Sequence, residues 1–191
     1  MNNAQPGLLD LLRSDVAAWA EIWLGPGATL NLAISFKLIF SYVGLRAALL
    51  YRLSHALQRR RVRLLPQFLY RLNLMAYGLD IPPSVAIGPG LYIPHPVGNV
   101  VMAERIGSRL TLVSGVTIGM RTEKGFPIIG DNVYIGAGAR VLGRIRIGNN
   151  VSIGANAVVL TDVPDHSTAV GVPATVRPAR NGAPVAQVRT I

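Results

Sequence analysis

Asp80 and His95 are the residues of this chain whose types and spacing best suit chemistry. Both lie in GLDIPPSVAIGPGLYIPHP, residues 78–96, which contains no other ionisable side chain except one tyrosine. A carboxylate that accepts a hydrogen bond from one imidazole nitrogen fixes the tautomer of the ring, and the second nitrogen can then take a proton from a hydroxyl group. The pair therefore suggests general-base catalysis, and the alternative is a structural histidine and a turn-forming aspartate in a proline-rich segment.

The two other histidines do not extend this site. His55 lies in YRLSHALQ, where a packed structural role on a helix is expected, and His166 lies in VPDHST, a turn expected after the last repeat. Three histidines so widely spaced do not make a zinc site with three histidine ligands, and the chain has no cysteine to act as a thiolate ligand or nucleophile. We therefore predict no metal site.

Composition limits the partners of the chain. Its 191 residues suffice for a hydrophobic core without disulfides or metal ions. The formal charge of +10 implies an anionic partner, which could be a phosphorylated cofactor, nucleic acid or an anionic membrane surface. The first residues, MNNAQPGLLDLLRSD, lack the basic segment and apolar run of a secretory signal, so we expect a cytoplasmic protein.

Residues 1–79 are predicted to form a helical amino-terminal region. Residues 8–23 carry apolar side chains at helical spacing, with acids and Arg13 on the opposite face, and GPGAT ends this helix. Residues 30–79 are apolar and helix-prone but are interrupted by basic residues, which favours packed helices over a membrane-spanning one. The interrupting residues are Lys37, Arg46 and Arg52.

The end of this region contains a basic and apolar segment, QRRRVRLLPQFLYRL. Arginines interleaved with leucine and phenylalanine suit contact with an anionic membrane surface, such as the inner face of the cell membrane. A solvated face is the alternative, because that is the usual role of a charge run.

From about residue 85 a six-residue repeat replaces the helical pattern. Strands of this length with one inward aliphatic residue cannot bury a face alone, so three per turn must stack into a triangular prism with about eighteen residues per coil. The strict repeat disfavours an ordinary β-sandwich, which is the alternative. The aliphatic positions are Ile87, Ile93, Ile106, Leu112, Ile118, Ile129, Ile135, Val141, Ile147, Ile153 and Val159.

The prism predicts which side chains stack and where the chain leaves the repeat. Each inward residue should lie over the one eighteen positions later: Ile129 over Ile147, Ile135 over Ile153 and Val141 over Val159. The step from Ile118 to Ile129 is eleven residues, so GMRTEKGFPI is predicted to form a loop. The glycines that follow four of the aliphatic residues are expected at corners with unusual backbone angles.

Three stretches resemble the serine acetyltransferase family of hexapeptide-repeat acyltransferases, which includes relatives that O-acetylate bacterial polysaccharides such as colanic acid. They are LDIPPSVAIGPGLYIPH, GVTIG and VYIGAGARVLGRIRIGNNVSIGANAVVLTDVPDHSTAVGVPATV, and the resemblance covers about residues 36–176. It implies an α + β fold in which amino-terminal helices (1–79) precede a left-handed parallel β-helix (80–176) and a tail (177–191). It also implies a homotrimer or a dimer of trimers, with acetyl-CoA between neighbouring prisms.

The resemblance assigns roles to single residues. In the family, a His at this spacing acts as the general base and an Asp orients it. The resemblance therefore implies that His95 is the base and that Asp80 orients it. Acetyl-CoA is then a co-substrate, with no permanently bound cofactor, held by small residues along its pantetheine arm and basic residues at its phosphates. The residues implied for acetyl-CoA binding are Gly119, Ala137, Ala155, Arg140 and Lys124.

The acceptor side departs from the family. Pro94 replaces an Asp just before the catalytic His, Gly125-Phe126 replaces an Arg-His pair, and LGPGATLN has no counterpart of an upstream Arg-Asp-Pro motif. A zwitterionic serine would lose charged hydrogen bonds of ~1.5–3 kcal/mol each. The sequence therefore favours a neutral sugar hydroxyl, with Phe126 or Tyr92 stacked on the acceptor.

The sequence as a whole predicts an acetyl-CoA-dependent O-acetyltransferase acting on a carbohydrate or an exopolysaccharide intermediate. One alternative is L-serine O-acetylation in cysteine biosynthesis through an atypical site. Another is a non-catalytic basic scaffold at a membrane. No RNA-binding motif supports a nucleic-acid partner, so the expected ligands are acetyl-CoA and a hydroxyl acceptor.

Overall fold

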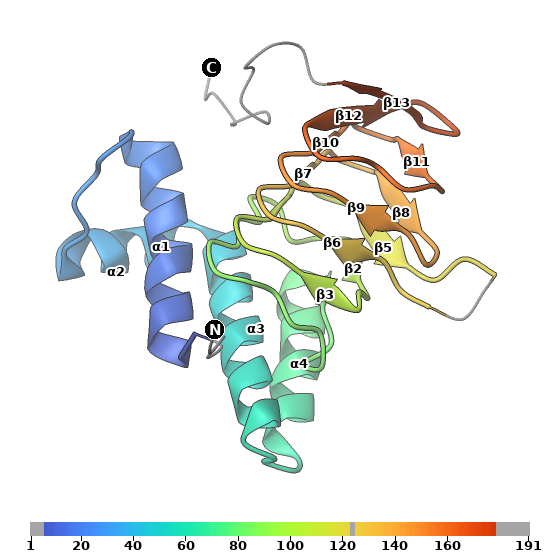
Figure 1. Cartoon of the computed structure of the whole chain (residues 1–191). Helices are drawn as coiled ribbons and strands as arrows, with labels where there is room; N and C mark the ends of the chain where they lie inside the picture. Colours follow the sequence, from blue (N-terminus) through green and yellow to red (C-terminus); the bar gives the residue numbers. More distant parts are fainter. Residues whose placement is uncertain (1–5, 123–124, 179–191) are drawn as a thin grey trace, which may run out of the picture.

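The computed structural model describes residues 6–122 and 125–178, which form a group of helices and a prism of short strands (Figure 1). The helices are α1 (Leu8–Leu24), α2 (Leu32–Ser41), α3 (Val43–Arg59) and α4 (Leu65–Tyr77). They lie at one end of the molecule, and the last strands, β10 to β13, lie at the other end of the prism. The predicted change from helices to repeats therefore occurs just before residue 80.

Local signals fix the ends of these helices. Asn31 caps α2 through its side chain, which accepts a hydrogen bond of 2.8 Å from the Ile34 amide. Pro66 occupies the first turn of α4, where a missing amide proton has no cost. Gly78 ends α4 with φ +64°, a left-handed conformation that glycine adopts without strain, and the chain then enters the first strand.

The amphipathic pattern of α1 is confirmed except at Asp15. This residue was assigned to the solvent face together with the other acids, but its side chain is fully buried. The reason is an ion pair with Arg52 of α3, which makes an acid acceptable on the buried face. None of the described helices is by itself long and apolar enough to cross a membrane. Taken together, α2 and α3, which join at a bend of 104°, have the required length and apolar composition.

The prism has three sheets, and consecutive strands join them in turn. The first sheet contains β1 (Leu79–Asp80), β2 (Asn99–Val101), β5 (Thr117–Gly119), β8 (Arg140–Leu142) and β11 (Val158–Val159). The second contains β3 (Arg105–Ile106), β6 (Ile128–Ile129) and β9 (Arg146–Ile147). The third contains β4 (Thr111–Leu112), β7 (Tyr134–Ile135), β10 (Ser152–Ile153), β12 (Ser167–Val170) and β13 (Thr175–Pro178). All pairs are parallel except β12 with β13.

The predicted stacking is confirmed residue by residue. The Cα partners are Ile129 with Ile147, Ile135 with Ile153 and Val141 with Val159, and these six side chains are at most 2% exposed. The predicted loop also occurs, between β5 and β6, and its described residues lead away from the prism in Figure 1. His166 lies within the last coil instead of after it, because β12 follows it and still pairs with β10.

The role predicted for the repeat glycines is wrong. The four glycines that follow repeat aliphatic residues do not have positive φ, and the left-handed corner positions include Asn132 and Asn150 instead. These glycines are Gly130, Gly136, Gly148 and Gly154. The glycines are required by the close approach of the next coil: a Cβ at Gly136 would lie 2.6 Å from the Ala155 nitrogen, and one at Gly148 would lie 2.2 Å from Asp165 Oδ1.

Candidate active site

Asp80 is held by a tyrosine from the preceding helix. It ends β1, pairs with Val100 of β2 and is half-buried. The hydroxyl of Tyr70, on α4, donates a hydrogen bond of 2.7 Å to Asp80 Oδ1. This bond, together with partial burial and the negative charge of Asp80, raises the pKa of Tyr70 to about 12. Tyr70 therefore remains a hydrogen-bond donor at neutral pH, a role that the sequence analysis missed.

His95 lies at the corner where the chain passes from the third sheet to the first. Its side chain is exposed, but its backbone is fixed. The fully buried Asn99 donates from Nδ2 to the His95 carbonyl at 3.0 Å and accepts at Oδ1 from the Val116 amide at 2.9 Å. The next coil thereby anchors the His95 turn, while the imidazole stays open to a substrate.

The two predicted catalytic residues lie on adjacent coils next to the same corner. The Gly98 amide, in the turn after His95, donates to the Gly78 carbonyl at 3.0 Å, just before β1. In the described parts of the chain no hydrogen bond joins the Asp80 and His95 side chains, and the donor to Asp80 is Tyr70. The contact between carboxylate and imidazole stays a prediction, and such catalytic contacts often tighten only when substrate binds.

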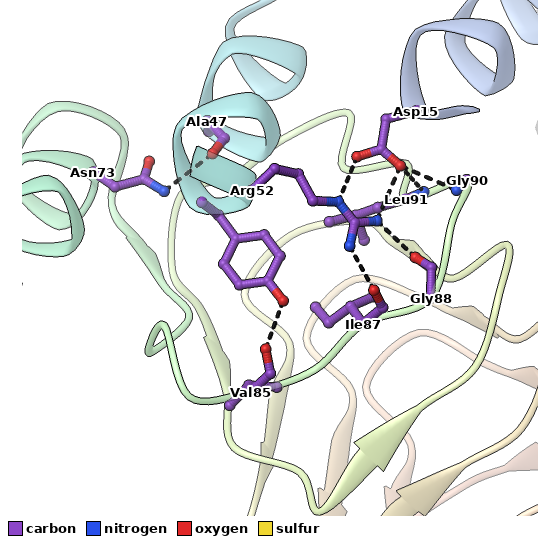
Figure 2. A network of polar contacts seen from close by, with 10 residues as sticks. Asp15, Ala47, Arg52, Asn73, Val85, Ile87, Gly88, Gly90 and Leu91 are labelled. Carbon is purple, nitrogen blue, oxygen red and sulfur yellow. Dashed lines mark hydrogen bonds and ion pairs between the residues drawn. The ribbon is translucent and has the colours of Figure 1, made fainter. Parts of the chain in front are cut away.

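A buried ion pair fixes the segment that leads to His95 (Figure 2). Arg52 on α3 donates from Nε to Asp15 Oδ2 at 2.8 Å and from Nη2 to Oδ1 at 3.0 Å. Asp15 Oδ1 also accepts hydrogen bonds from two backbone amides of the first coil, and Arg52 donates hydrogen bonds to two backbone carbonyls of the same coil. The amides belong to Gly90 and Leu91, and the carbonyls to Ile87 and Gly88. Helices α1 and α3 therefore jointly position the coil that carries the candidate base.

Ala137 and Ala155 lie at the same corner of the prism as His95. Ala137 is half-buried and Ala155 is exposed. Backbone hydrogen bonds connect this corner from coil to coil, including Gly115 to Val97 at 3.2 Å and Asn156 to Ala137 at 2.8 Å. The result is a strip of small residues that begins near His95, as a groove for an extended pantetheine arm requires.

Gly119 and Phe126 lie at a different corner, where the chain passes from the first sheet to the second. Gly119 ends β5, and a Cβ built on it would have no atom within 4 Å, so open space adjoins this position. Phe126 is half-buried at the end of the loop between β5 and β6. Lys124 lies outside the described residues. Of the described residues, Gly119 and Phe126 therefore lie at another corner of the prism than His95.

Two predicted ligand contacts take structural roles. Tyr92 is 2% exposed, with its ring centroid 4.6 Å from that of Trp19, so its assignment to acceptor binding is wrong because α1 covers the ring. Arg140 donates from Nη1 to the carbonyls of Gly115 at 2.6 Å and Gly138 at 2.9 Å. It thereby connects neighbouring coils, and this nitrogen is not free for a phosphate.

Comparisons with known proteins match this architecture. Residues 126–161 match the family model described as Bacterial transferase hexapeptide (six repeats). A serine acetyltransferase from Helicobacter pylori J99 is 44% identical over 143 residues, which cover 73% of this chain and 84% of the relative. The crystal structure of Neisseria gonorrhoeae serine acetyltransferase in complex with serine has a TM-score of 0.75 and 34% identity, covering 88% of this chain and 68% of that one. A serine acetyltransferase structure in complex with CoA has a TM-score of 0.77 and 32% identity, covering 89% and 69%.

These matches correct the sequence interpretation of the acceptor. The matched proteins are serine acetyltransferases, so the predicted carbohydrate acceptor and the emphasis on polysaccharide enzymes are wrong. The non-catalytic scaffold is wrong because the relatives are enzymes. The error arose at Pro94 and Gly125-Phe126, where missing charged side chains were interpreted as a change of substrate class.

Proposed function

The chain belongs to the serine acetyltransferase family, and from that premise we propose that it transfers the acetyl group of acetyl-CoA to the hydroxyl group of L-serine. It is an acetyl-CoA-dependent O-acetyltransferase with acetyl-CoA as its co-substrate. The extent of the match with the Helicobacter pylori relative, which includes most of that protein, carries the serine assignment. The product would be O-acetylserine, a precursor in cysteine biosynthesis.

His95 is the general base in this proposal. Its imidazole removes the proton from the serine hydroxyl as the oxygen attacks the thioester carbonyl. The tetrahedral intermediate then breaks its carbon–sulfur bond, and the CoA thiolate leaves and takes the proton from the imidazolium. The exposed side chain of His95 leaves space for both substrates, and a base so placed contributes about 10² to 10⁴ in rate.

Asp80 and Tyr70 support the base in turn. Because Tyr70 binds Oδ1 of Asp80, the second carboxylate oxygen is the one available to the imidazole. A carboxylate there fixes the ring tautomer and stabilises the imidazolium that forms during the reaction. Tyr70 is a positioning residue, since its hydroxyl contacts Asp80 and not the reacting atoms.

We propose that the site is completed between protomers of a trimer with left-handed prisms. His95, Ala137 and Ala155 lie at one corner, whereas Gly119 and the loop that includes Phe126 lie at another. A cyclic arrangement brings the loop corner of one protomer against the His95 corner of the next, so that each site uses two chains. A cytoplasmic location stays a prediction.

The charges of serine need contacts other than those implied at Pro94 and Gly125-Phe126. Arg121 is exposed at the start of the loop, two residues after Gly119 and the open space beside it. We propose that its guanidinium binds the serine carboxylate. Arg121→Gln should then raise the KM for serine about tenfold and leave the KM for acetyl-CoA unchanged.

Thiol release from acetyl-CoA tests the proposed function. L-Serine should accelerate release well above the hydrolysis background, and D-serine and L-alanine should not. His95→Ala should lower kcat at least about a hundredfold with little change in the KM for acetyl-CoA, and His166→Asn should match the parent protein. An absence of serine-dependent release in the parent protein would overturn the proposal.

A further inference from the structure

Positive charge is concentrated in the helical region. Residues 22–79 contain no Asp or Glu but eight Lys or Arg. Two of these cations have roles inside the fold, because Arg52 pairs with Asp15 and Arg46 donates to the carbonyls of Ile39 and Phe40 at the end of α2. Four of the other six gather where α3 turns into α4. They are Arg59, Arg60, Arg61 and Arg63.

This turn, residues 59–68 and called the tip below, projects from the molecule. Every side chain of residues 59–65 is exposed, and the ion pairs of the described chain do not involve the tip arginines. In Figure 1 the tip lies at the lower end of the helices, away from strands β10 to β13. Its cations therefore face solvent, and no ion pair of the described residues neutralises them.

Large apolar side chains lie among these cations. Leu64 is 82% exposed, Phe68 is 62% exposed and Leu65 is 45% exposed. Cations next to exposed leucine and phenylalanine form the pattern of a surface that lies in the headgroup region of a bilayer, where the apolar groups reach the acyl chains. The aliphatic side chains do not suit nucleic acid, because leucine cannot stack on a base.

The backbone of the tip carries an arginine where glycine is the usual residue. Arg61 has φ +60° and follows the end of α3 in a Schellman motif, with the Val62 amide bonded to the Leu57 carbonyl at 3.1 Å and the Arg61 amide to the Gln58 carbonyl at 2.9 Å. A side chain in this conformation is strained relative to glycine. The position thus carries a positive charge at the expense of local stability, which indicates a use for that charge outside the turn.

We propose that the tip is a docking surface for anionic phospholipid membranes. The arginines contact the lipid phosphates, and Leu64 and Phe68 insert at the boundary of the acyl chains. This surface is separate from the His95 corner, so docking leaves acetyl transfer intact and places the enzyme against the bilayer. Docking by the tip does not depend on which acceptor the enzyme acetylates.

Sedimentation of the full chain with vesicles tests the docking. We expect recovery in the pellet with vesicles of phosphatidylcholine and phosphatidylglycerol, little recovery with phosphatidylcholine alone, and release at high salt. Arg60→Gln with Arg63→Gln should weaken binding about 25-fold, at about fivefold for each cation. Leu64→Gln with Phe68→Gln should weaken it at least about tenfold.

Two further variants separate docking from general charge and from folding. Arg105→Gln with Arg146→Gln removes the same charge from exposed positions on β3 and β9, and it should barely change binding. Arg61→Gly should keep or raise Tm, because glycine suits φ +60°, and still weaken binding about fivefold. Thiol release should be unchanged in all tip variants.

Three outcomes would overturn the proposal. One is equal recovery in the supernatant with both vesicle types at low salt. Another is that Arg60→Gln with Arg63→Gln and Arg105→Gln with Arg146→Gln weaken vesicle binding equally, which would mean that net charge alone explains the binding. The third is tighter binding to duplex RNA than to anionic vesicles at equal phosphate concentration, with the tip variants losing it, which would make the tip a nucleic-acid surface.

Discussion

Among the described residues, the helical region buries polar side chains and exposes apolar ones, whereas the prism does the reverse. Five of the seven buried polar or charged residues belong to the helices, and only Asn99 and Ser167 belong to the prism. Of the twenty exposed large apolar residues, sixteen lie before β1. The prism is therefore stabilised by repeated aliphatic contacts, and the helices depend on a few specific polar contacts.

This difference indicates what each region contributes to function. The aliphatic interior of the prism makes a rigid column that holds the His95 corner. The helices position the first coil and leave large apolar side chains exposed. An open cavity of about 1190 Å³ lies between the helices and belongs to the same apolar surface. Leu49, Leu53 and Leu72 form part of its wall.

The largest effect should come from a charge inside the prism. Ile135→Asp places a carboxylate at a site that is 0% exposed, between Leu112 and Ile153, where no polar group can pair with it. We expect a loss of at least about 5 kcal/mol, enough to abolish folding, measured by urea denaturation or by recovery of soluble protein. Ser152→Asp, on the outward side of the same sheet, should cost far less. A soluble Ile135→Asp protein with unchanged Tm would show that the aliphatic contacts do not dominate the prism.

The next effect tests the polar contacts of the helices. Arg52→Met leaves the Asp15 carboxylate buried without its cation, and we expect a loss of about 3–5 kcal/mol in the free energy of unfolding. The double variant Asp15→Asn with Arg52→Met should recover part of this loss. The side-chain oxygen of asparagine can still accept hydrogen bonds from the backbone N–H groups of Gly90 and Leu91. If Arg52→Met costs no more than an exposed substitution such as Arg71→Met, the contrast between the regions fails.

The same contrast explains how far the sequence predicted the fold. The stacking of Ile129, Ile135 and Val141 on the next coil was predicted because each coil repeats the last, so spacing alone gives the register. The ion pair of Asp15 and Arg52 was missed because its residues are 37 positions apart and belong to no repeat. A lone acid on the apolar side of α1 was the available signal.

The candidate site was predicted in part for similar reasons. The positions of Asp80 and His95 on adjacent coils follow from the repeat, whereas the contact of Tyr70 with Asp80 depends on how α4 meets β1. Tyr92 was misassigned because the repeat predicts that a side chain points outward from the prism but not that α1 covers it. Prediction therefore failed where the two regions meet.

Tyr70→Phe measures how that junction affects catalysis. The substitution removes one hydroxyl from a half-buried site and frees Oδ1 of Asp80. We expect kcat to fall about tenfold, or ~1.4 kcal/mol, with the KM values and Tm nearly unchanged and the pH profile of kcat displaced. Tyr77→Phe, two turns further along α4, is the matched control. Unchanged kcat and pH profile in Tyr70→Phe would remove the helices from the catalytic arrangement.

The smallest effect should be the response of His55 to acid, which tests whether buried polar groups make the helices the pH-sensitive region. Burial lowers the pKa of His55 below its ordinary value of 6.5, although the hydrogen bond of its Nδ1 with the Pro83 carbonyl opposes this shift. The unfolded chain then binds the proton more tightly than the folded one. The contribution of His55 to stability is therefore complete above pH 6.5 and is lost as the pH falls from 6.5 through the lowered pKa of the folded state. We expect Tm to fall by no more than about a few degrees from this group across that range. His55→Asn should flatten the decline, because an amide can donate to Pro83 at any pH, whereas His166→Asn, at an exposed left-handed position that suits asparagine, should leave it intact. An identical decline in His55→Asn and in the parent protein would assign the acid response to other groups and weaken the distinction between the two regions.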